Sequence, residues 1–191
     1  MSLEQDIVDF CSDGFVIIAI GRYSLEKGFD ILLKALIPLW EKIPNLKLLL
    51  IGEGGCRGQY ENIIRENNLE NRVLLAGYRP EAWRYLTLAD LYVISSWTEG
   101  LPITLLEAMR SKVPVVATRV GGIPEVLHGE KGGFLLPPGN PQELARMIET
   151  CFSNPALAGE KAEFCYNRFH DHYTSRAMAE KYLAIYRELL S

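Results

Sequence analysis

The sequence has no hydrophobic run that approaches the ~18 residues a helix needs to cross a membrane. It also lacks an excess of positive charge, since 20 Lys and Arg residues stand against 24 Asp and Glu residues, for a formal net charge of −4. Domains that bind nucleic acids usually carry a clear basic excess. These absences argue against direct membrane insertion and against a nucleic-acid partner.

The first residues lack the basic flank and the apolar stretch of a signal peptide. We therefore expect a cytoplasmic protein. Residues 1–14 are polar and acidic, and they are expected to be a lead-in or an expression remnant. Residues 15–191 suffice for one domain with a sizeable core, but not for two ordinary domains.

Metal-binding patterns are missing as well. The four cysteines show no CxxC spacing, and the three histidines form no ligand pattern with them. We expect free, reduced thiols rather than a zinc site or disulfides. There is also no Asp-x-Asp pair that could hold a metal ion against a diphosphate. The sequence therefore predicts no metal and no cofactor.

Three common motifs are absent or incomplete. Gly52-Glu-Gly54 begins like the dinucleotide-binding fingerprint, but Arg57 stands where the third glycine belongs, and the preceding strand is not the first. No P-loop lysine–serine pair follows a glycine loop, and no Ser-His-Asp set is visible. Binding of NAD is therefore not expected.

What the chain does contain is a regular alternation of apolar runs and helix-like segments. Several runs are near-continuous in Val, Ile and Leu, as in strands buried on both faces of a parallel sheet. The alternation predicts an α/β fold, a Rossmann-like, doubly wound parallel sheet of about six strands with flanking helices. The expected strands are 15–20, 46–51, 73–77, 91–94, 113–118 and 134–136. The expected helices are 28–42, 56–68, 80–88, 102–111, 123–128 and 140–153, followed by two C-terminal helices over 155–168 and 172–190.

The last of these helices carries an apolar stripe of Met178, Tyr182, Ile185 and Leu189 at helical spacing. Two alternatives follow from such a stripe. It packs on its own domain, or it docks on another one.

Five of the predicted strands run into glycine-containing turns, and the carboxyl ends of parallel strands form the ligand-binding edge of such a sheet. Arg22 and Lys27 follow the first strand, between Gly21 and Gly28. An arginine offers a planar fork to a phosphate, and a lysine offers a point charge. Their joint placement predicts an anion-binding pair rather than two solvated surface cations.

The stretch Glu99-Gly-Leu-Pro-Ile-Thr-Leu-Leu-Glu107 places two carboxylates eight positions apart. Pro102 suits the first turn of a helix, whose free N–H groups can bind an anion. The expected phosphate donors are the backbone N–H groups of Gly100, Leu101, Ile103 and Thr104. Glu107 suits two vicinal ribose hydroxyls, because an ionised carboxylate only accepts hydrogen bonds. A nucleotide-sugar offers both phosphates and hydroxyls.

Five motifs, in this order, resemble the carboxyl-terminal half of glycosyltransferase family 4, the group 1 glycosyltransferases, which are retaining enzymes of the GT-B fold. The motifs are Gly21-Arg22 to Lys27-Gly28, Gly52-Glu-Gly54, Gly77-Tyr78, Glu99 to Glu107, and Gly121-Gly122-Ile-Pro-Glu125. The resemblance covers nearly the whole chain from Phe15 onward.

The resemblance implies a role for each matching residue. Arg22 and Lys27 would neutralise the donor diphosphate and stabilise it as it leaves, and Glu99 would face the donor sugar. These three are the expected catalytic residues, and Glu107 would bind the ribose. The other expected residues of the nucleotide-sugar site are Gly21, Gly54, Tyr78 and Arg79, the last two beside the base, and Gly100, Leu101, Ile103 and Thr104. The ligand would be a nucleoside diphosphate sugar of UDP or GDP type, bound as a substrate and without a metal.

The amino-terminal domain, which binds the acceptor in this family, has no counterpart in the chain. The resemblance therefore implies the donor-binding half of an enzyme that moves a hexosyl unit to a glycan or lipid-linked acceptor, and this half is expected to be inactive alone. The last helix would cross back to the missing domain, which could also bring the enzyme to the inner membrane face.

Two alternative functions remain open. The chain could be half of a sugar-nucleotide epimerase, against which the spacing of Glu99 and Glu107 argues. It could also be a non-catalytic nucleotide-binding or interaction module, which has no need for Arg22, Lys27, Glu99 and Glu107 together.

Overall fold

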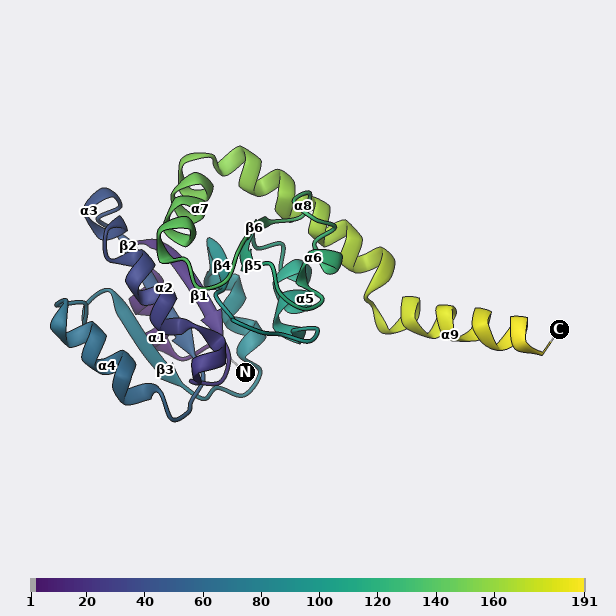
Figure 1. The fold of residues 1–191 in the computed structure, drawn as a ribbon, viewed down its shortest axis with the longest axis horizontal. Coiled ribbons are helices and arrows are strands. Elements are labelled where there is room, and N and C mark those ends of the chain that lie inside the picture. Colours follow the sequence, from purple (N-terminus) through teal and green to yellow (C-terminus); the bar gives the residue numbers. More distant parts are fainter. Residues whose placement is uncertain (1–2, 191) are drawn as a thin grey trace.

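The apolar runs of the sequence form a six-stranded, all-parallel sheet in the computed structural model, which describes residues 3–190. The strands are β1 (Phe15–Ile20), β2 (Leu46–Ile51), β3 (Val73–Gly77), β4 (Leu91–Ile94), β5 (Val115–Thr118) and β6 (Phe134–Leu136). Their order is β3-β2-β1-β4-β5-β6 (Figure 1). The predicted doubly wound α/β sheet is confirmed.

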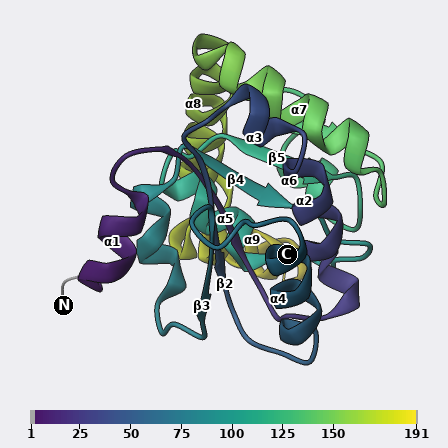
Figure 2. The same cartoon turned by 90° about the vertical axis from the view of Figure 1, so that its left-hand side faces the viewer.

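Helices cover both faces of the sheet (Figure 2). Because side chains alternate along a strand, Ile17 and Ala19 of β1 join one apolar core, and Val16 and Ile18 join the other. The first core is completed mainly by α2 (Phe29–Leu36), α3 (Leu39–Lys42), α4 (Arg57–Glu66) and α7 (Pro141–Ser153). The second is completed mainly by α1 (Gln5–Cys11), the 3₁₀ helix η2 (Ala82–Leu88), α5 (Ile103–Arg110), α6 (Ile123–Val126) and α8 (Pro155–His172).

Several predicted elements differ from the structure in their extent or type. The helix expected over 28–42 is broken into α2 and α3 at Pro38, which has no N–H for a continuing helix. The segment 80–88 forms the 3₁₀ helix η2 instead of an α-helix. The fifth strand begins at Val115, because the N–H of Val113 bonds to the carbonyl of Ala108 and closes the end of α5.

The strand order reverses between β1 and β4, and this point fixes where a ligand can bind. The chain leaves β1 toward α2 on one face and leaves β4 toward α5 on the other. Doubly wound sheets bind ligands at the carboxyl edge beside such a reversal. Here the two loops also touch, since the N–H of Trp97 bonds to the carbonyl of Glu26. Arg22 and Lys27 lie in the first loop, and Glu99 lies in the second.

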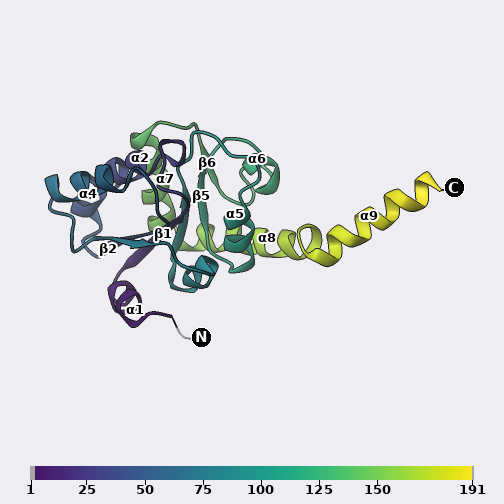
Figure 3. The same ribbon diagram turned by 90° about the horizontal axis from the view of Figure 1, so that it is seen from below.

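The two ends of the chain differ in how they pack on the domain. The segment expected as a polar lead-in forms α1, whose Ile7 and Cys11 are buried in the second core. At the other end, α9 (Ser175–Leu189) extends away from the sheet (Figures 1 and 3). Its stripe of Met178, Tyr182, Ile185 and Leu189 is exposed, so it does not pack on its own domain. No described helix has the length and apolarity to span a membrane.

Candidate functional site

The centre of the candidate site is an ion pair between the loops that follow β1 and β4. Lys27 ends the 3₁₀ helix η1 (Leu25–Lys27), and its Nζ donates to Oε1 of Glu99 at 2.7 Å. The Lys27 side chain is 27% exposed and that of Glu99 is 10% exposed. The Lys27 stem passes over Gly21, where an added Cβ would touch Cδ and Cε at 3.4 Å. The predicted Gly21, Lys27 and Glu99 therefore lie together.

The start of α5 presents unused backbone donors beside this pair. Pro102 caps the helix with an extended backbone, so α5 begins at Ile103 rather than at Pro102 as predicted. Among the described residues, no hydrogen bond is made by the backbone N–H groups of Gly100, Leu101, Ile103 and Thr104. Free N–H groups at a helix start bind anions, aided by the helix dipole. The arrangement can therefore hold a phosphate.

Glu107 lies one turn further along α5 and is half-buried. Burial raises the pKa of its carboxyl group above the usual glutamate value, and the nearby Arg110 partly opposes this shift. A carboxylate that has lost part of its hydration gains more from hydroxyl donors than one in open water does. Its position and environment fit an acceptor for ligand hydroxyls.

A cavity of about 340 Å³ adjoins the carboxyl ends of β1, β2 and β3. It is lined by Gly21 and Arg22 on one side and by Tyr78 and Arg79 on the other. Arg79 is held by an ion pair with Glu4, while the Tyr78 side chain is 72% exposed. Ligand pockets in proteins usually measure about 300–1,000 Å³, so this space can hold part of a small ligand.

Glycines at this edge let loops pack against other loops. Gly28 has a φ of +59°, and an added Cβ would come within 2.3 Å of the Ser95 carbonyl oxygen. Gly121 has a φ of +53°, and an added Cβ would come within 2.0 Å of the Glu99 carbonyl oxygen. Gly54, predicted to bind the ligand, sits against the Tyr23 backbone and does not line the cavity.

Two sets of buried hydroxyl groups near the site escape sequence reasoning. Ser95, Ser96 and Thr118 are buried and hydrogen-bonded at the ends of β4 and β5. Tyr92 of β4 is fully buried beside Thr104, and burial raises the pKa of its hydroxyl well above the usual value. The sequence signal for the two serines and Thr118 is a hydroxyl at the end of an apolar run, which is too common to single out a residue, and Tyr92 lies inside such a run.

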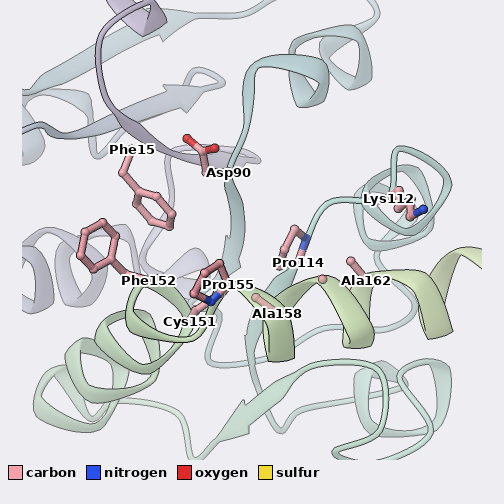
Figure 4. Close-up of a pocket in the computed structure, with 10 residues that line it drawn as sticks. Phe15, Asp90, Lys112, Pro114, Cys151, Phe152, Pro155, Ala158 and Ala162 are labelled. Atoms are coloured by element: carbon pink, nitrogen blue, oxygen red, sulfur yellow. The ribbon is translucent and has the colours of Figure 1, made fainter.

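A cavity of about 380 Å³ lies at the opposite edge of the sheet, at the amino ends of β1, β4 and β5 (Figure 4). It is lined mostly by apolar groups such as Phe15, Phe152 and Pro155, and by none of the predicted residues. In residues 3–190, no three His, Cys, Asp or Glu side chains gather as a metal site would require.

The family model described as "Glycosyl transferases group 1" matches residues 4–168. The chain belongs to the group 1 glycosyltransferases. Among curated members, the chain is 31% identical over 178 residues to EpsD of Bacillus subtilis, named as a glycosyltransferase, covering 92% of this chain and 47% of EpsD. It is 31% identical over 179 residues to the amylovoran biosynthesis glycosyltransferase AmsK of Erwinia amylovora, covering 86% of this chain and 43% of AmsK.

Solved structures agree with this family. Anabaena HepE, solved in complex with UDP-glucose, superposes with a TM-score of 0.82 at 26% identity, covering 96% of this chain and 54% of that one. The sheet and its helices thus match the GT-B glycosyltransferase fold. The chain spans about half the length of the curated group 1 glycosyltransferases it matches.

Proposed function

We propose that this chain is the donor-binding domain of a retaining glycosyltransferase. The parent enzyme moves a hexosyl unit from a nucleoside diphosphate sugar to a glycan or lipid-linked acceptor. The observation that carries the proposal is the Lys27–Glu99 pair beside the open start of α5, at the point where the strand order reverses. The UDP-glucose bound to HepE supports a ligand of this class.

Each part of the donor has a matching group in this proposal. The base enters the cavity beside Tyr78 and Arg79, and the ribose hydroxyls donate to Glu107. The diphosphate lies over the N–H groups at the start of α5, between them and the cations Arg22 and Lys27. An ammonium group has three N–H donors, so Lys27 can hold Glu99 and a phosphate oxygen together. Glu99 accepts hydrogen bonds from the sugar.

Catalysis in this proposal is mainly electrostatic. As the glycosidic bond to the diphosphate breaks, negative charge grows on the phosphate oxygens. In this proposal Arg22, Lys27 and the helix N–H groups stabilise that charge as it grows, which lowers the barrier. We nominate no protein nucleophile for this step, and nucleotide binding is proposed to need no metal.

An acceptor domain completes the enzyme in this proposal. The chain covers about half of its relatives, and α9 presents an exposed apolar face without a partner among the described residues. We propose that this face contacts the acceptor domain. The isolated chain then binds the donor without transferring the sugar, because acceptor positioning and exclusion of water are both missing.

A thermal-shift screen with UDP, GDP and their sugars tests the proposal. A ligand at a hundred times its Kd stabilises a protein by about 2.7 kcal/mol, which is a clear shift. The controls are the protein without any ligand and the protein with AMP, a nucleotide that has no diphosphate. Stabilisation by none of these donors would contradict donor binding, and conversion of the free donor sugar to its epimer would favour an epimerase instead. Transfer by the chain alone would contradict the half-enzyme assignment.

A further inference from the structure

The buried serine and threonine side chains of residues 3–190 gather at one place. They are Ser95, Ser96 and Thr118, each no more than 2% exposed, at the carboxyl ends of β4 and β5. A buried hydroxyl group is costly unless it makes a hydrogen bond. Ser95 donates to the Lys27 carbonyl at 2.9 Å and Thr118 donates to the Ser96 carbonyl at 2.7 Å. Both bonds join loops through the backbone.

Ser96 differs from the other two because its hydroxyl donates to a side chain. Its Oγ lies 2.6 Å from Oε1 of Glu99, the same oxygen that accepts from Lys27 at 2.7 Å. Within the described chain, no hydrogen bond uses Oε2 of Glu99. A carboxylate can accept on both oxygens. The two donors therefore fix one oxygen and leave the other for a ligand.

The side chains of Lys27 and Ser96, which both donate to Glu99, differ in flexibility. Lys27 reaches Glu99 on a flexible four-carbon stem, and its ammonium group has a second task at the diphosphate in the proposed function. Ser96 is fully buried on the strand side of the loop, and it stands only three residues from Glu99. Ser96 therefore keeps the carboxylate in place while Lys27 adjusts to the phosphates.

We propose that Ser96 is a positioning residue that aims Oε2 of Glu99 at the hydroxyls of the donor sugar. The inference rests on the proposed function, because it assumes a nucleotide-sugar at this site. The proposal predicts one specific effect. Loss of the Ser96 hydroxyl weakens recognition of the sugar and spares recognition of the nucleotide.

The test compares the Kd of a nucleoside diphosphate with that of its sugar by calorimetry. The probes are UDP with UDP-glucose, or GDP with GDP-mannose, whichever pair the wild-type chain binds. We define the sugar advantage as the Kd of the nucleotide divided by the Kd of its sugar. In Ser96→Ala we expect the nucleotide Kd to stay within about threefold, while the sugar advantage falls about tenfold, as for loss of a charged hydrogen bond. Ser95→Ala is the matched control, since it removes an equally buried serine hydroxyl whose bond goes to backbone. We expect it to lower stability without changing the sugar advantage.

A double-mutant cycle separates positioning from general loosening of the loop. In a Glu99→Ala background, Ser96→Ala should cause no further loss of the sugar advantage, because the group it positions is gone. If Ser96→Ala does not fold, Ser96→Cys replaces it, with a weak S–H donor at similar volume and the same expected loss.

The outcomes are distinct. An unchanged sugar advantage in a folded Ser96 variant, an equal loss in Ser95→Ala, or a further loss in the Glu99→Ala background overturns the inference and leaves the proposed function standing. A wild-type chain that binds neither pair overturns both.

Discussion

The Nζ atom of Lys27 lies 2.7 Å from Oε1 of Glu99, although 72 positions of sequence separate the two residues. The pair joins the loop after β1 to the loop after β4, across the point where the strand order reverses. Both side chains are partly shielded from water. Removing one partner of a shielded pair leaves the other charge without compensation, so each variant should have effects beyond the lost contact.

The first prediction concerns Lys27. Lys27→Met keeps much of the stem and removes the charge, so UDP affinity should fall about tenfold or more, the usual effect of losing a charged hydrogen bond. Glu99→Gln should change UDP affinity less than threefold, because Glu99 faces the sugar in our proposal. Calorimetry with UDP measures both. An unchanged Kd in a folded Lys27→Met would mean that Lys27 only holds Glu99.

The second prediction is that nucleotide binding needs no metal. The diphosphate charge is met by Arg22, Lys27 and the N–H groups at the start of α5, and the sequence has no Asp-x-Asp pair to hold a metal against it. The Kd of the preferred nucleotide should agree within about twofold in magnesium and in excess EDTA. A tenfold loss in EDTA would show that a cation bridges protein and phosphate.

Much of the fold was predictable because parallel strands buried on both faces leave a strong sequence signal. The runs Phe15–Ile20 and Leu46–Ile51 are almost wholly apolar, and they form β1 and β2 at the expected residues. The same logic places Lys27 and Glu99 at one edge of the sheet, since both follow parallel strands, but it does not predict their ion pair. The roles in binding and catalysis remain predictions.

Other features depend on tertiary contacts that no local pattern reports. The residues of α1 look polar, yet Ile7 and Cys11 anchor that helix in the second core. Gly54 and Gly121 each lie where two backbones come close together, which no local sequence pattern reports. Ser96 looks like any serine, and only the folded loop brings it to Glu99.

The third prediction concerns pH and Glu107. Burial raises its pKa in the fold above the unfolded value, so the fold favours the protonated form. The stability that this group contributes is full below the unfolded pKa of about 4.3 and is lost as the pH rises through the folded pKa. Glu107→Gln should therefore have a higher Tm than wild type at pH 7, with a smaller difference at pH 4.

The same substitution should weaken UDP binding about tenfold at pH 7, because the ribose loses a charged acceptor. Thermal unfolding between pH 4 and 7 and calorimetry with UDP measure the two effects. A lower Tm at pH 7 would show that the ionised carboxylate stabilises the unliganded fold.

The fourth prediction concerns α9. In the described part of this helix, Ala177 is the one buried side chain, so the helix adds little to the apolar core. A chain ending at Tyr173 should keep its UDP affinity and a Tm within about 3 °C of the full chain. It should also lose association with the acceptor half of the parent enzyme, measured by co-purification. Unfolding of the shortened chain would show that α9 supports its own domain.

The fifth prediction concerns Gly121, whose φ of +53° brings it against the loop that carries Glu99. An added Cβ would lie 2.0 Å from the Glu99 carbonyl oxygen and 2.8 Å from that of Gly100. Both contacts are with backbone, so the loop itself must move. Gly121→Ala should therefore lower the Tm and weaken binding of the nucleotide-sugar about tenfold or more, because the start of α5 and the Glu99 carboxylate shift together.

Gly129→Ala is the matched control for this change. Gly129 also has a positive φ, +66°, but no atom lies within 4 Å of the position of an added Cβ. This variant has the left-handed backbone strain alone, about 1–2 kcal/mol, and should lose only about 2–8 °C in Tm with an unchanged Kd. Equal effects of the two substitutions on the Kd would mean that contact with Glu99 and Gly100 is not what makes position 121 matter. A larger effect of Gly121→Ala would tie donor binding to the close approach of these two loops.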